Sequence, residues 1–133
     1  MAYGFDENNC KVNVEEKRLI WQNANPGQDF PAKRLTISGL RDYECIEIET
    51  KTGNIFKFNV HALADDISNG GLMAICIKSP EQGSLVYLTQ RSISFDLYAN
   101  GVVFGDCYCK LLTASNVTTT NSYLIPYAIY GLK

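Results

Sequence analysis

The sequence has little of what metal centres and acid–base catalysis require. Its 133 residues include a single histidine, His61, and contain neither a Gly-x-Ser-x-Gly nor a His-Glu-x-x-His motif. None of the five cysteines forms a Cys-x-x-Cys pair, and their odd number argues against a disulfide framework. Cys107-x-Cys109 is the ordinary spacing of two side chains on one face of a strand. We therefore expect no enzyme activity, no metal site and no cofactor.

Positive charge and long apolar runs are also scarce. The net charge is −2 and the isoelectric point is about 5.3, whereas nucleic-acid binders usually carry a basic face. No apolar run approaches the roughly 20 residues that cross a bilayer. The first seven residues lack the basic and apolar regions of a signal peptide. We expect neither nucleic acid nor a membrane as a partner, and synthesis in a cytoplasm without a secretory signal.

What the sequence does contain is the composition of one globular domain. Hydrophobic residues make up 46% of the chain and charged residues 20%. Residues 1–17 are polar and break the apolar pattern, which predicts a short N-terminal leader or docking arm. Residues 18–133 then form the domain.

Short apolar–polar alternations, separated by turn residues about every ten positions, run through that domain. In residues 43–50, Ile46 and Ile48 share one face, and residues 55–60 return after the turn at Gly53. Residues 92–97 alternate in the same way. Residues 72–77 are apolar at both odd and even positions, which predicts a central strand covered on both faces. The pattern predicts an all-β fold: an antiparallel β-sandwich, jelly-roll-like, with eight or nine short strands.

Two polar stretches interrupt the strands and are predicted to be loops, at residues 61–71 and 113–122. His61 beside Asp65 and Asp66 could act as a general base, but a hydrogen-bonded histidine at a strand end explains it as well. The acidic residues match no calcium-loop spacing. The loops supply candidate contacts to a receptor or partner: Asp65, Asp66, Asn69, Asn116, Thr118 and Thr119.

The stretch from Trp21 to Phe30 has the chemistry of a tight corner. Asparagine side chains accept hydrogen bonds from backbone two residues on, proline fixes φ, and Gly27 permits a positive φ. The last eleven residues are apolar almost to the end, so they must join a sheet or a partner. We expect the two ends of the domain to pack together, with structural anchors at Trp21, Asn25, Pro26, Phe30, Pro126 and Tyr130.

Three pieces of sequence together resemble a known kind of domain. They are Trp21-x-Asn23-x-Asn25-Pro26-x-x-x-Phe30, then Arg91-Ser92-Ile93 followed by Val103-Phe104-Gly105-Asp106, and the ending Asn121-Ser122-Tyr123-Leu124-Ile125-Pro126-Tyr127-Ala128-Ile129-Tyr130-Gly131-Leu132-Lys133. Their order resembles a small C-terminal β-domain of virion-surface proteins of tailed bacteriophages and prophages, of head-fibre or tail-appendage type. The resemblance spans residues 18–133. Such proteins usually carry a longer stalk, whereas Val14 and Trp21 here are only seven positions apart.

The resemblance implies a structural protein displayed on a virion as a head fibre, decoration or tail appendage. It implies other virion proteins as partners, a homo-oligomer with three copies favoured, and contact with a host-surface glycan as a candidate activity. The alternative function is a carbohydrate-binding module that uses exposed aromatic rings and loops. A cell-wall hydrolase built on His61 is the third.

Overall fold

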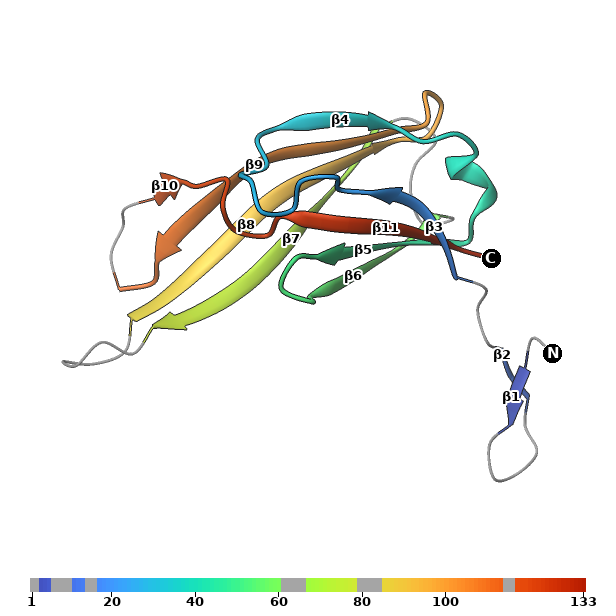
Figure 1. The fold of residues 1–133 in the computed structure, drawn as a ribbon, viewed down its shortest axis with the longest axis horizontal. Helices are drawn as coiled ribbons and strands as arrows, with labels where there is room; N and C mark the ends of the chain where they lie inside the picture. Colours follow the sequence, from blue (N-terminus) through green and yellow to red (C-terminus); the bar gives the residue numbers. More distant parts are fainter. Residues whose placement is uncertain (1–2, 6–10, 14–16, 61–66, 79–84, 114–116) are drawn as a thin grey trace.

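Figure 1 shows the computed structural model of the chain, in which two β-sheets pack together and an N-terminal hairpin stands apart from them. The structure describes residues 3–5, 11–13, 17–60, 67–78, 85–113 and 117–133. Its elements are β1 (Tyr3–Phe5), β2 (Lys11–Asn13), β3 (Lys17–Gln22), β4 (Lys33–Thr36), the 3₁₀ turn η1 (Leu40–Asp42), β5 (Cys45–Thr50), β6 (Ile55–Asn59), β7 (Ile67–Lys78), β8 (Leu85–Asp96), β9 (Gly101–Leu111), β10 (Val117–Thr119) and β11 (Pro126–Leu132).

The sandwich consists of a four-stranded and a five-stranded antiparallel sheet. The four-stranded sheet has the order β3-β11-β5-β6. The five-stranded sheet has the order β10-β9-β8-β7, and β4 pairs with another part of β9. The predicted all-β sandwich is confirmed. Strands β7, β8 and β9 are not short, however, because backbone pairing carries each of them through 11 or 12 residues.

The core lies between the sheets and is built from the alternating positions. Ile46 and Ile48 of β5 are fully buried, as are Ile93 and Phe95 of β8, whereas Ile55 is exposed. The predicted inward faces of these strands are therefore confirmed. Other buried members of the core are Leu35, Ile37, Leu40, Leu72, Leu97, Val102, Phe104, Leu124, Ile125 and Ile129.

The prediction of a central strand at residues 72–77 is wrong, since β7 is the last strand of the five-stranded sheet. The expected loop around Asn69 is wrong as well. Asn69, Gly70 and Gly71 belong to β7 and lie opposite Ser94, Ile93 and Ser92 of β8. The continuous ladder with β8 outweighs the turn preference of Asn-Gly-Gly, because each residue of β7 gains a partner along the whole strand.

Two irregularities interrupt the strand pairing. Between Arg91 and Ile93, one residue of β8 faces two of β9, so Gly105 and Asp106 form a β-bulge. A Cβ at Gly105 would collide with the Ser92 side chain, which explains the glycine there. Pro126 is the first residue of β11, next to a register shift in the pairing with β5. A proline is tolerated at this position because the first residue of a strand need not donate to the ladder.

The two ends of the domain pack together as expected. Trp21 of β3 lies opposite Ile129 of β11, and its half-buried ring meets the Phe30 ring edge-on at 6.2 Å between centroids. The corner is held by Asn23, whose Oδ1 accepts from the Asn25 amide and whose Nδ2 donates to the Pro126 carbonyl. Gly27 does not adopt a positive φ.

A buried guanidinium lies at the junction of these features. Arg91 has no exposed surface, and no carboxylate in the described part of the chain pairs with it. It donates from Nε to the Leu124 carbonyl at 3.0 Å and from Nη2 to the Tyr123 carbonyl at 2.9 Å. Its Nη1 donates to the carbonyls of Phe30 and Gly105, both at 2.8 Å. Four carbonyl dipoles thus take the place of water around this cation.

These four bonds join the corner, the bulge and the approach to β11. Leu124 is held at a φ of +48°, in the left-handed region that a leucine rarely adopts, and its carbonyl is one of the acceptors. Burial lowers the pKa of Arg91 below its usual range, because desolvation disfavours the charged form. An arginine nevertheless stays charged at neutral pH, so the junction keeps all its donors.

Replacing Arg91 with lysine should cost about 2–4 kcal/mol of unfolding free energy although the charge is retained. An ammonium has three donors on one atom and cannot reproduce the planar fork, so carbonyls buried at the junction lose their partners. The matched control is Arg34→Lys, since Arg34 forms an exposed ion pair with Asp96 at 3.2 Å. Urea unfolding should move by no more than about 0.5 kcal/mol for that variant. Equal losses in the two variants would contradict the role given to Arg91.

Candidate functional site

The structure brings the sequence-predicted contact residues into no single site. Asp65, Asp66 and Asn116 lie outside the described residues, as does His61. Asn69 lies within β7, and the exposed Thr118 and Thr119 lie on β10. The predicted loop at residues 113–122 is therefore wrong for residues 117–119, which pair with β9. Thr118 pairs with Cys109 of β9, whose neighbours across the sheet are Thr89 and Ala74. Asn69 is five residues along β7 from Ala74, or about 17 Å, so the two predicted loops mark different regions of the sheet.

The described part of the chain also contains no evident metal site. Within it, no three side chains of histidine, cysteine, aspartate or glutamate gather closely enough to hold an ion. Cys45 and Cys109 are free thiols. Across the same residues, no helix has the length and apolar character needed to traverse a bilayer.

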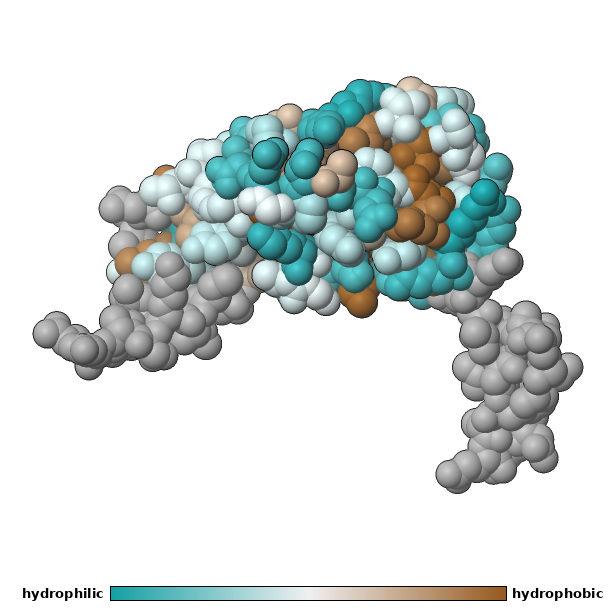
Figure 2. Space-filling view, in the orientation of Figure 1, coloured by the Kyte–Doolittle hydropathy of each residue, from teal (hydrophilic) through white to brown (hydrophobic). Residues whose placement is uncertain are grey.

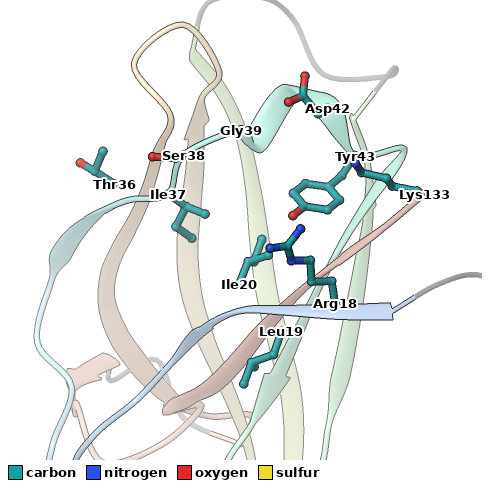
Figure 3. Close-up of a pocket in the computed structure, with 10 residues that line it drawn as sticks. All are labelled: Arg18, Leu19, Ile20, Thr36, Ile37, Ser38, Gly39, Asp42, Tyr43 and Lys133. Atoms are coloured by element: carbon teal, nitrogen blue, oxygen red, sulfur yellow. The ribbon is translucent and has the colours of Figure 1, made fainter.

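A groove of about 500 Å³ lies between β3 and η1, and we call it the β3–η1 groove. It lies between the edge strands β3 and β4 and includes the segment that leads into η1 (Figure 3). Its lining is formed by Arg18, Leu19, Ile20, Thr36, Ile37, Ser38, Gly39, Asp42, Tyr43 and Lys133, and a second hollow beside it adds Lys17. Figure 2 shows hydrophobic atoms gathered between the positions of β3 and η1 in Figure 1, with hydrophilic ones around them.

Backbone contacts fix the wall of the groove formed by η1. Asn100, at the turn between β8 and β9, has a φ of +54°, and its carbonyl accepts from the Ile37 amide at 2.8 Å. Its Oδ1 accepts from the Leu40 amide at 3.3 Å. The turn at Asn100 thus anchors the segment between β4 and η1. Tyr43 follows in extended conformation and turns its ring toward β11.

Tyr43 is positioned by a glycine on β11. A Cβ at Gly131 would overlap the Tyr43 ring, so only glycine lets the ring lie against this strand. Lys133 holds its ammonium 5.4 Å from the centre of the same ring. With 7% of its surface exposed, the ring offers no open face, while the hydroxyl points into the groove.

Basic side chains outnumber acidic ones in the lining of the groove. Lys17 pairs with Glu47 at 2.8 Å and lies 4.1 Å from the centre of the Tyr130 ring. The hydrogen bond to Glu47 raises the pKa of Lys17. Arg18 has no hydrogen bond or ion pair with any described residue, and Figure 3 shows its guanidinium directed into the same space as the Tyr43 hydroxyl. The acidic residue in the lining is Asp42. This arrangement can bind a carboxylate or another anion next to an apolar strip.

The sequence pattern does not predict this groove. Residues 17–20, 36–43 and 133 are far apart in the chain, and each fragment alone has the pattern of an ordinary strand, turn or chain end. Tyr130 was expected to be an anchor, and it is half-buried beside Lys17 on β11. The unequal distribution of charge becomes visible only when β3 pairs with β11.

Comparisons with known proteins identify no relative of this chain. The chain matches no protein-family model, no curated protein and no solved structure.

Replacing Gly131 with alanine should destabilise the domain by about 1–3 kcal/mol, because the new methyl group displaces the Tyr43 ring from β11. Gly27→Ala is the matched control, since a Cβ there meets no atom within 4 Å. Its unfolding free energy should change by no more than about 0.5 kcal/mol. Thermal unfolding followed by circular dichroism measures both variants, and similar stability in the two would show that Tyr43 does not depend on the glycine.

Proposed function

We propose that this chain is a structural protein of a bacteriophage or prophage virion, displayed as a head fibre, decoration or tail appendage and without enzymatic activity. The observation that carries the proposal is the convergence of the resembling segments on Arg91. Residues 21–30, 91–93, 103–106 and 121–133 are distant in sequence, yet Arg91 bonds to a carbonyl in each of the other three. The resemblance therefore falls on a single structural junction, as expected when it reflects a shared fold.

The architecture also suits an assembly component. The β1–β2 hairpin stands apart from the sandwich in Figure 1, and its strands pair only with each other among the described residues. The strand β3 is a free edge of the four-stranded sheet, and such edges readily pair with other chains. The partners we propose are other virion proteins and further copies of this chain, with three copies favoured. Synthesis takes place in the host cytoplasm and the destination is the virion.

Purified particles provide the test. Antibodies against this chain should label intact particles from the source organism at regular positions in electron micrographs, and mass spectrometry should detect the chain in the particle fraction. A cytoplasmic protein of similar abundance serves as the control for carry-over. Recovery of the chain in the soluble fraction alone, with label absent from particles, would exclude the virion role.

Carbohydrate binding is the second candidate, and Tyr108 favours it. Its side chain is 48% exposed on β9, with Gln90 of β8 on one side and Thr119 of β10 on the other. An exposed ring flanked by hydrogen-bonding side chains can stack on a sugar and hold its hydroxyl groups. Tyr98 is more exposed, at 68%, but lies in the turn after β8.

A glycan array separates the two functions. If sugar binding is the activity, Tyr108→Ala should weaken binding to the recognised glycan about tenfold or more, as loss of a stacking ring does, and Tyr98→Ala should leave it unchanged. An array without any bound glycan would remove this candidate and leave the structural role. Hydrolysis of cell wall that disappears in His61→Ala would instead favour the hydrolase.

A further inference from the structure

The β3–η1 groove lies along a sheet edge that is open to another strand. Within the described residues, β3 pairs with β11 on one side and with no strand on the other. Figure 3 shows the side chains of Ile20 and Ile37 facing the hollow, whereas that of Leu19, which is 48% exposed, points to the other side of β3. A free edge beside an apolar strip can accept an extended peptide, which gains backbone hydrogen bonds and places alternate side chains in the hollow.

A peptide fits this groove better than a sugar. Sugar rings stack on exposed aromatic faces, but the Tyr43 ring is covered by Gly131 on one side and approached by Lys133. What remains accessible is backbone, the apolar strip and the cationic groups of Arg18 and Lys133. These are the features that recognise an acidic, extended segment.

The chain itself contains such a segment in its N-terminal arm, residues 1–16. The arm carries Asp6, Glu7, Glu15 and Glu16 against a single base, Lys11. Its described part forms the β1–β2 hairpin, and a two-stranded hairpin alone is marginally stable in water. The negative charge of the arm is complementary to the basic side chains of the groove. The hairpin would also gain a further strand by pairing with the open edge of β3.

We propose that the β3–η1 groove binds the acidic N-terminal arm of a second copy of this chain. Figure 1 shows the β1–β2 hairpin away from its own sandwich. Passing each arm to the next copy gives a head-to-tail interface, and such an interface closes into a ring when the rotation between copies allows it. Three copies are the number that the proposed function favours. This inference rests on that function, since it names the contact through which the copies assemble.

Charge reversal in the full-length chain tests the groove. The groove variant combines Arg18→Glu with Lys133→Glu, and the control combines Lys51→Glu with Lys110→Glu, which makes the same charge change at exposed positions outside the groove. Sedimentation across a range of concentrations should show the wild type and the control associating toward three times the 14.8 kDa chain mass. The groove variant should need about tenfold or more higher concentration, with circular dichroism showing that it is folded.

A compensating variant supplies the decisive comparison. Adding Asp6→Lys and Glu7→Lys to the groove variant should restore association, because both partners then have reversed charge, whereas the arm substitutions alone should weaken it. Monomers at all concentrations, equal association of the groove variant and the control, or no rescue would each overturn the inference. The particle-labelling experiment tests the virion role independently of the groove. If particles are labelled but the groove variant associates like the wild type, the groove is not the binding site for the arm and the proposed function still stands.

Discussion

The buried Arg91 guanidinium is the interaction on which the rest of the fold depends. It connects parts of the chain that no strand pairing joins directly: the corner at Phe30, the bulge at Gly105 and the segment before β11. A cation without solvent is costly unless its donors are satisfied, and here carbonyl oxygens satisfy them. The same geometry accounts for the strained backbone at Leu124. Removing the guanidinium would leave several buried acceptors unpaired at once.

That junction also sets the position of the candidate site. Once residues 123 and 124 are held, β11 enters the four-stranded sheet between β5 and β3. Gly131, near the end of β11, then receives the Tyr43 ring, and β3 is left as an edge strand. The groove between β3 and η1 is thus a consequence of how the last strand is inserted. An arm passed between copies would cover an edge that the sandwich leaves open.

Much of the fold follows from local patterns, and the site does not. The alternation around Ile46, Ile48 and Phe95 identifies the buried faces, and the Gly105-Asp106 pair marks a bulge. The apolar end of the chain correctly predicts pairing with the Trp21 segment, since a strand so apolar must be covered. The edge position of β7 could not be predicted. Its residues are apolar at both odd and even positions, and this pattern does not show whether both faces of the strand are buried or one is exposed. Arg91 resembles any charged residue in the sequence, and the groove is assembled from three distant fragments.

Native-state hydrogen exchange tests the central claim most directly. Three amides near the junction lie outside regular strand pairing: Phe30 donates to the Asn121 carbonyl, Lys51 to that of Ile125 and Thr120 to that of Cys107. If Arg91 makes the corner, the bulge and the last strand one cooperative unit, these amides should exchange only by global unfolding, as slowly as those of Ile93 and Phe95 in β8. The account would be contradicted if the amides of Phe30, Lys51 and Thr120 exchanged through a local opening of much lower free energy while the β8 amides stayed protected.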